Sequence, residues 1–242
     1  LNFGNPEKLD VYYQLNQAVR GISEACSLFG TPVVSGNVSL FNESHGRAIY
    51  PTPVIGMLGV LDDVSKSLRA GFSVPNCPVY LLGAQPRQEA STLAGSEYLE
   101  AAHNRVAGLP SVDLEAEYRL QRFLLQLHAE GLVVSAHDCS DGGLAVTLAE
   151  SAVLGTTGFT GSVTFDGRLD AGLFGEAQGR IVVSIVPDTF RQGGGAARLE
   201  DLAGAAQVPY ARLGQTTDSG TFTIGPIATT VAQLTEAYET GI

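Results

Sequence analysis

The first side chains that could bind a ligand lie in residues 35–43, which read Ser-Gly-Asn-Val-Ser-Leu-Phe-Asn-Glu. Gly36 lets a ligand approach the backbone closely. Asn37 and Ser39 carry side-chain oxygens that can reach a hard cation or a phosphate-bearing group. The same residues also fit a tight connection in which Asn and Ser bond their own backbone. Spacing alone leaves both interpretations open.

A second candidate is residues 137–143, His-Asp-Cys-Ser-Asp-Gly-Gly, between a predicted strand and a predicted helix. Such a turn aims free N–H groups at an anion, and Asp138 is close enough to hold Mg²⁺ against it. The string contains neither the Gly-Lys-Ser/Thr of a Walker loop nor a complete Gly-x-Gly-x-x-Gly fingerprint. Helix capping by Ser140 or Asp141 explains it equally well.

A third candidate is residues 174–180, Phe-Gly-Glu-Ala-Gln-Gly-Arg, before a buried strand. Glu176 and Gln178 could place a carboxylate and an amide beside a ligand, although a plain strand entry is favoured here. The remaining candidates indicate no catalytic site. We expect three histidines to lie on the surface and three cysteines to be reduced thiols. These residues are His45, His103, His128, Cys26, Cys77 and Cys139. We find no Cys-His or Ser-His-Asp arrangement for nucleophilic catalysis.

Strands that alternate with helices must position these loops, so we expect an α/β or α+β layered fold. Helices are predicted from Asn5, as cap, to Gly30, and over residues 113–129, 144–154, 198–206 and 231–238, with a short helix or loop in 94–107. Strands are predicted at 32–34, 53–61, 79–82, 132–136, 163–165, 181–186, 210–214 and 221–224. Residues 193–195 read as a helix-entry loop, and a boundary near residue 72 divides domains 1–71 and 72–242.

Composition narrows the class of protein. The chain has 242 residues, 44% of them hydrophobic and 16% charged, with a formal net charge of −11. This excludes a disordered chain and argues against a protein that binds the nucleic-acid backbone. We find no apolar window of about 18 residues and no signal peptide, and so expect a cytoplasmic protein without a membrane span. Because the chain opens on Leu1 and its only methionine is Met57, we expect a piece of a longer polypeptide.

Five strings of the sequence resemble, in order, the second half of the small bacterial-type phosphoribosylformylglycinamidine synthase, subunit II. They are Leu-Asn-Phe-Gly-Asn-Pro-Glu-Lys at the start, Gly-Asn-Val-Ser-Leu-Phe-Asn-Glu, Ala-Ile-Tyr-Pro-Thr-Pro-Val-Ile-Gly-Met, His-Asp-Cys-Ser-Asp-Gly-Gly-Leu and Phe-Gly-Glu-Ala-Gln. The resemblance runs from end to end. It implies an aminoimidazole-ribonucleotide-synthetase-like fold, with a partial N-terminal-type domain and a complete C-terminal-type domain whose mixed sheet is flanked by helices.

The resemblance also implies an activity, that of an ATP-dependent carbon–nitrogen ligase in purine biosynthesis. Formylglycinamide ribonucleotide, ATP and glutamine-derived ammonia give formylglycinamidine ribonucleotide, ADP and phosphate. In that family ATP activates the formamide oxygen as a phosphate ester, which ammonia displaces, and Mg²⁺ offsets phosphate charge. The implied partners are the N-terminal half of the same polypeptide, a glutaminase subunit and a small accessory subunit.

The family's roles transfer to four positions. Gly36 falls on an ATP-contacting glycine, Asn37 on a Mg²⁺ ligand and Ser39 on a substrate-contacting serine. Asp138 falls on a position that binds Mg²⁺ in the first half and is auxiliary or structural in the second. Ala177 replaces the serine of the Glu-Ser-Gln substrate loop, which fits a site that no longer handles substrate.

Two elements of the family are missing from this sequence: the catalytic histidines of the first half, and an ATP-contacting aspartate that precedes the opening string. We therefore expect no synthase activity from the chain alone, and self-association through uncovered apolar surface. Two alternatives stay open. One is another superfamily member, such as aminoimidazole ribonucleotide synthetase or thiamine-monophosphate kinase, against which the opening string argues. The other is a nucleotide-binding scaffold without chemistry of its own.

Overall fold

The chain divides into two compact units, Leu1–Ser65 and Lys66–Ile242. A computed structural model describes residues 1–83, 90–163, 167–188 and 194–241. The domain limits predicted above, 1–71 and 72–242, stay a prediction.

The first unit is built on helix α1, Leu9–Phe29. The predicted cap at Asn5 is wrong: its Oδ1 accepts a hydrogen bond from the Glu7 N–H at 2.8 Å, which closes a turn ahead of the helix. Lys8, in an extended conformation, is the residue that precedes α1. A short amide side chain satisfies a turn two residues further on as readily as it caps a helix. The predicted end is confirmed, because Gly30 adopts φ 65° and its N–H bonds the Cys26 carbonyl.

The strands predicted at 32–34 and 53–61 are wrong. Both segments are irregular, and their apolar side chains are exposed, with Val34 at 91% and Leu58 at 94%. A strand needs a neighbour for its N–H and C=O groups. In the described first unit, regular pairing is limited to the hairpin of β1, Glu43–Ser44, and β2, Arg47–Ala48. The apolar runs therefore have no sheet to join.

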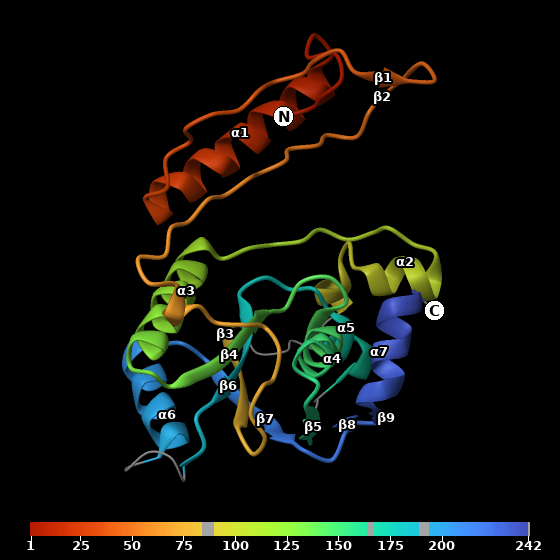
Figure 1. The fold of residues 1–242 in the computed structure, drawn as a ribbon. Helices are drawn as coiled ribbons and strands as arrows, with labels where there is room; N and C mark the ends of the chain where they lie inside the picture. Colours follow the sequence, from red (N-terminus) through yellow and green to blue (C-terminus); the bar gives the residue numbers. More distant parts are fainter. Residues whose placement is uncertain (84–89, 164–166, 189–193, 242) are drawn as a thin grey trace. The chain divides into compact units, whose positions relative to one another are not determined.

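The second unit contains a seven-stranded sheet with the order β4-β6-β3-β7-β5-β8-β9 (Figure 1). All neighbouring strands are antiparallel except β5 and β8, which are parallel, so the predicted mixed sheet is confirmed. The strands are β3 (Pro78–Gly83), β4 (Val133–Asp138), β5 (Gly158–Gly161), β6 (Arg180–Ile185), β7 (Tyr210–Thr217), β8 (Thr221–Ile224) and β9 (Ile227–Thr230).

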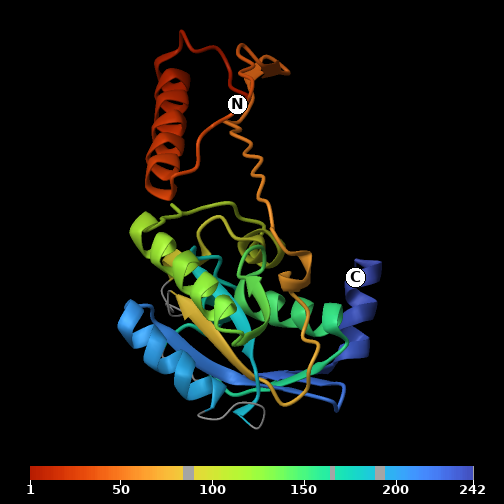
Figure 2. The same ribbon diagram turned by 60° about the vertical axis from the view of Figure 1, so that its left-hand side comes forward.

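Helices cover both faces of this sheet (Figure 2). Helices α3 and α6 pack on one face, and α4, α5 and α7 on the other. The helices are α2 (Glu97–His103), α3 (Leu114–Ala129), α4 (Gly143–Gly155), α5 (Leu169–Phe174), α6 (Gly195–Ala206) and α7 (Val231–Thr240), with the short 3₁₀ turns η1 (Val64–Lys66) and η2 (Ala90–Leu93). The layered α/β fold expected from the sequence is confirmed.

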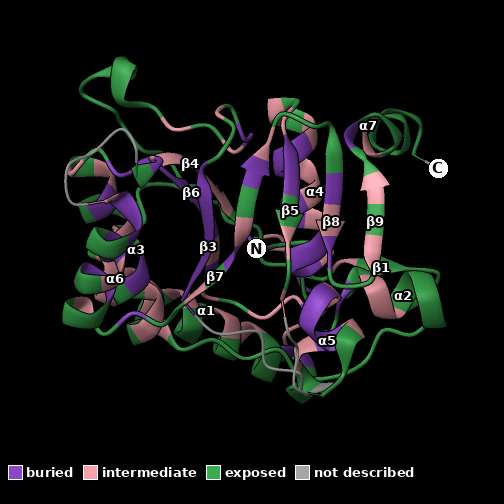
Figure 3. Ribbon diagram, turned by 90° about the horizontal axis from the view of Figure 1, so that it is seen from below, coloured by how far each residue is buried: buried purple, intermediate pink, exposed green. Residues whose placement is uncertain are grey.

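Strand β3 lies between these two layers, which explains its unbroken apolar sequence. Val79 and Leu81 pack on the α4 side, while Tyr80 and Leu82 pack on the α3 and α6 side, and all four are fully buried. Figure 3 shows β3 in the colour of buried residues. A strand covered on both faces has no solvent side on which polar residues would alternate.

Some elements of the second unit differ from expectation. Of the strand predicted at 163–165, Val163 lies in no strand and residues 164 and 165 lie outside the described part, whereas the structure forms β5 at Gly158–Gly161. Phe159 anchors β5 between the rings of Phe72 and Phe222, with centroids 6.0 and 5.9 Å away. Helix α5 and strand β9 were not predicted, and of residues 193–195 the first lies outside the described part.

Candidate functional site

A single carboxylate joins two helix starts in the second unit. Oε1 of Glu176 accepts a hydrogen bond from the Gly142 N–H at 2.8 Å, just before α4, and from the Glu97 N–H at 2.9 Å, the first residue of α2. The first N–H groups of a helix have no partner inside it and carry partial positive charge. The half-buried carboxylate of Glu176 therefore has two donors that suit its charge.

Arg180, the first residue of β6, holds the backbone on either side of Glu176. Its side chain is 4% exposed. The Nε donates to the Ala177 carbonyl at 3.0 Å, and Nη2 donates to the Gly175 carbonyl. Burial lowers the pKa of the Arg180 guanidinium, and the nearby Cys139 thiol and Glu176 carboxylate oppose that shift. Residues 175–179 are called the 175–179 loop below.

The second candidate site contacts this loop through its two glycines. Gly143 has φ +68°, and a Cβ there would lie 2.5 Å from the Gly175 carbonyl oxygen. Gly142, with φ +76°, is the residue that precedes α4, and no side chain caps this helix. The predicted capping by Ser140 or Asp141 is therefore wrong. The Gly142 N–H that the sequence offered to an anion is already bound to Glu176.

Asp138 lies at the end of β4, opposite Ile181 of β6, and it is exposed. Thr147 of α4 donates to its backbone carbonyl at 3.3 Å. Its neighbour His137 is half-buried, with Nδ1 3.2 Å from the Ser151 hydroxyl and Nε2 3.5 Å from Glu150. Asp138 lines a hollow of about 430 Å³ together with Ser140, Asp141, Glu176 and Arg180.

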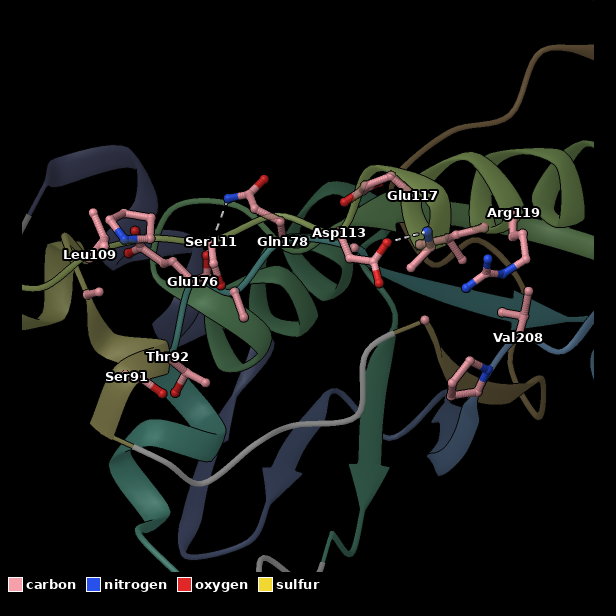
Figure 4. A pocket seen from close by; sticks show the side chains of 18 of the residues that line it. Ser91, Thr92, Leu109, Ser111, Asp113, Glu117, Arg119, Glu176, Gln178 and Val208 are labelled. Atoms are coloured by element: carbon pink, nitrogen blue, oxygen red, sulfur yellow. Dashed lines mark hydrogen bonds between the residues drawn. The ribbon is translucent and has the colours of Figure 1, made fainter. Parts of the chain in front are cut away.

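A second hollow of about 380 Å³ shares part of this lining (Figure 4). Glu117, Glu176 and Gln178 belong to both, so the structure brings the second and third candidate sites together. Glu117 was not predicted. Burial raises the pKa of its carboxyl, against the hydrogen bond that the Gly179 N–H donates. Its position one turn before the buried Leu120 of α3 is a signal that could have indicated it.

The first candidate site lies in the other unit, where its residues divide into two groups. Ser39 bonds Asn42 through its hydroxyl, and the Asn42 amide donates to the Phe3 carbonyl at 3.1 Å. The Phe3 N–H in turn donates to the Ser39 carbonyl at 3.0 Å. Gly36 and Asn37 are exposed, and a Cβ at Gly36 would meet no atom within 4 Å. The hydrogen bonds of the first unit therefore explain why a serine stands at position 39. No contact in this unit explains why position 36 is a glycine.

The two predicted magnesium ligands, Asn37 and Asp138, could each supply one protein ligand and not a complete coordination sphere. Within the described ranges, no group of three or more His, Cys, Asp and Glu residues gathers as a metal site. Mg²⁺ prefers six oxygen ligands and keeps several waters or phosphate oxygens among them. Asn37 offers an exposed amide oxygen and Asp138 an exposed carboxylate, each in its own unit, which is compatible with such a partly hydrated ion.

The cysteines and histidines carry no further site. All three cysteines are free, and burial raises the pKa of the Cys77 and Cys139 thiols. His45 and His103 are exposed as predicted, whereas His128 is half-buried on α3. Across the described ranges no helix has the length and apolar character to cross a bilayer.

Fold and sequence together define the class of this protein. Residues 74–225 match the C-terminal domain of AIR synthase related proteins, and residues 1–61 match the N-terminal domain of the same group. The chain belongs to the AIR synthase related protein family.

Within this family, the chain is similar to one particular kind of synthase. The chain is 44% identical over 248 aligned residues to phosphoribosylformylglycinamidine synthase subunit PurL of Thermomicrobium roseum, covering 100% of this chain and 32% of that protein. PurL of Anaeromyxobacter sp. Fw109-5 is 42% identical, again over 100% of this chain and 32% of that protein. The resemblance to this synthase is confirmed, and the chain spans about a third of the length of these curated relatives.

Solved structures agree on the fold. Thermotoga maritima PurL complexed with FGAR matches with a TM-score of 0.71 at 15% identity, covering 97% of this chain and 38% of that one. The same protein complexed with ATP matches with a TM-score of 0.63 at 16% identity, covering 90% of this chain and 35% of that one.

Gly143 provides a prediction with an internal control. Replacing Gly131 by Ala forces an L-residue to φ +67° in open space, whereas at Gly143 the same change also drives a Cβ against the Gly175 carbonyl. We expect Gly131→Ala to lower the free energy of unfolding by about 1 kcal/mol and Gly143→Ala by at least about 2 kcal/mol more. Urea unfolding followed by circular dichroism measures both. Equal losses would show that the 175–179 loop does not lie against α4.

Glu117 provides a pH-dependent prediction. Its raised pKa means that the folded chain holds this proton more tightly than the unfolded chain. The contribution of protonated Glu117 to the free energy of unfolding is fully present below the pKa of the unfolded chain, near 4.5. This contribution is lost as pH rises through the pKa of the folded chain. Glu117→Gln should therefore have a higher Tm than the parent at about pH 7, and the gap should close as pH falls toward the unfolded value.

The matched control is Glu115→Gln, an exposed carboxylate on the same helix. Its Tm difference from the parent should change little over the same pH range. A Glu117→Gln difference that is constant with pH contradicts the assignment of Glu117 as a desolvated carboxylate.

Proposed function

We propose that this chain is the C-terminal portion of a phosphoribosylformylglycinamidine synthase. The proposed reaction is the ATP-dependent conversion of formylglycinamide ribonucleotide and glutamine-derived ammonia to formylglycinamidine ribonucleotide in purine biosynthesis. The observation that carries the proposal is the alignment of the entire chain with PurL at 44% identity. The family's two domain types also follow one another here in order, over residues 1–61 and 74–225.

The residues of the 35–43 segment have complementary roles in this proposal. Gly36 allows an ATP phosphate to reach the backbone, because no side chain stands there and the surrounding space is open. Asn37 contributes its exposed amide oxygen to Mg²⁺. When bound, Mg²⁺ offsets the phosphate charge during the transfer. Ser39 contacts the substrate with a hydroxyl whose orientation Asn42 holds, at an oxygen–oxygen distance of 3.2 Å.

Asp138 has an auxiliary role in this proposal. Its carboxylate is exposed at the end of β4 and can serve as one ligand of a second Mg²⁺. The nearby Gly142 N–H is bound to Glu176, so a phosphate at this place loses its best backbone donor. This favours a structural role for the 137–143 turn over a part in the chemical step.

The isolated chain is proposed to be inactive, since it corresponds to about a third of its relatives and no catalytic histidine is assigned to it. The apolar residues of 53–61 support this view, because Val54, Met57 and Val60 are 69%, 75% and 87% exposed. Exposed apolar surface of this kind marks a contact site. Proposed partners are the N-terminal half of the polypeptide, a glutaminase subunit and a small accessory subunit, in the cytoplasm. Without them, the uncovered surface favours self-association.

Complementation tests the function. The chain is mixed with the corresponding N-terminal half of a PurL relative, ATP, Mg²⁺ and ammonia, and ADP release is measured with and without formylglycinamide ribonucleotide. We expect ADP formation that requires both halves and the ribonucleotide. ADP release that is indifferent to the ribonucleotide would contradict the ligase and favour a related kinase or synthetase. Nucleotide binding without any turnover would favour a non-catalytic scaffold.

Asn37 provides the site-directed prediction. In the complemented or full-length enzyme, Asn37→Ala should lower the turnover with ATP at least tenfold, which corresponds to about 1.4 kcal/mol of transition-state stabilisation. Asn16→Ala, at an exposed position of α1, is the control and should leave the turnover unchanged. Equal turnover of the Asn37 variant and the parent would remove Asn37 from the site.

A further inference from the structure

The outer face of helix α3 carries a groove of about 550 Å³, called the α3 groove below, whose lining includes Tyr118, Arg119, Arg122, Phe123 and Leu125, with Ala206 of α6 at its border. We propose that this groove is a docking surface for an acidic segment of another protein chain, one with an aliphatic side chain among its carboxylates. The inference does not depend on the proposed synthase activity, because the docking needs neither ATP nor the ribonucleotide.

The α3 groove combines a buried apolar base with an exposed apolar rim. Phe123 is 1% exposed and belongs to the core that α3 shares with its neighbour α6 (Figure 3). Leu125 is 58% exposed. It lies three residues after Arg122, so the two side chains share one face of the helix. An aliphatic side chain of a partner that lies in the groove covers Leu125 and removes its apolar area from water.

Two exposed arginines give this face its charge. Arg119 and Arg122 are three residues apart on α3 and are therefore neighbours on its surface. Residues 118–129 contain no acidic residue, although the chain has 25 of them. Among the described residues neither arginine forms an ion pair, whereas Arg198 of α6 pairs with Glu130 at 2.9 Å. Both guanidinium groups are thus available to carboxylates of a partner, which arginine can bind through two parallel hydrogen bonds.

The charge of the whole chain narrows the choice of partner. A net charge of −11 disfavours a nucleic acid. A symmetric contact between two copies would set this face against itself and oppose arginines to arginines. At physiological ionic strength charges are screened over roughly 8 Å, so the arginines at the contact outweigh distant acidic residues. An acidic segment of a different chain is therefore the occupant that the groove favours.

Peptide binding tests the proposal. The probe is a fluorescein-labelled amphipathic peptide built from Glu, Leu and Ala, and its fluorescence anisotropy is measured as the chain is added. We expect saturable binding with a Kd on the order of 100 μM or tighter in about 50 mM salt, and weaker binding as the salt concentration rises. Two matched peptides, with Gln in place of Glu or with Ser in place of Leu, should bind at least about fivefold more weakly.

Three variants of the chain locate the contact. Arg122→Ala and Leu125→Gln change exposed side chains, so the core of the unit stays intact. We expect each to weaken binding at least about fivefold while its Tm stays within about 2 °C of the parent. Arg105→Ala removes an exposed arginine that does not line the α3 groove, and it changes the net charge by the same amount. This matched control should bind the peptide as the parent does.

Three results would overturn the proposal. The first is the absence of saturable binding of the Glu-containing peptide at chain concentrations up to about 1 mM. The second is an Arg105→Ala variant that loses as much affinity as Arg122→Ala, which would show attraction to charge without a defined surface. The third is self-association in sedimentation velocity that Arg122→Ala abolishes, which would make a second copy of this chain the occupant.

Discussion

The second unit depends on the 175–179 loop, which is held by the hydrogen bonds of Glu176 and of the buried Arg180. The carboxylate ties the starts of α2 and α4 together, and the guanidinium ties the carbonyls on either side of that carboxylate. Together they fix the 175–179 loop at the point where β6 begins.

Much of the surrounding architecture follows from that loop. Gly143 must lack a side chain because the Gly175 carbonyl lies against it. Glu117 of α3 receives the Gly179 N–H, which joins the helix layer on one face of the sheet to the loop that meets α4 on the other. The two hollows beside Asp138 and Gln178 lie between this loop and α3, and Glu117 lines both of them. The 175–179 loop therefore contacts helices on both faces of the sheet.

The sequence predicted helices and strands correctly where apolar residues recur at helical spacing or form a short continuous run that a sheet buries. The strand predicted at 79–82 and the helix predicted over 113–129 are confirmed as β3 and α3, and α3 buries Leu120, Phe123 and Leu127. The same reasoning failed at 53–61, since an apolar run reports a need for burial and not the presence of a partner strand. In the candidate site, the sequence identified Asp138 and Glu176 as residues that could bind a ligand. It did not show that the two lie on one hollow, because Glu176 forms its hydrogen bonds with residues 34 and 79 positions away. The roles of Gly36, Asn37 and Ser39 rest on resemblance, and the structure adds the hydrogen bonds that hold Ser39.

Amide hydrogen exchange at Gly142 and Glu97 tests the central claim most directly. Neither N–H belongs to the repeating hydrogen bonds of a helix, so protection there reports the Glu176 carboxylate itself. We predict that both amides exchange slowly in the parent chain and lose protection together in Glu176→Ala, while amides in the middle of β3 keep theirs. Fast exchange of both amides in the parent, or protection that survives removal of the carboxylate, would contradict the account.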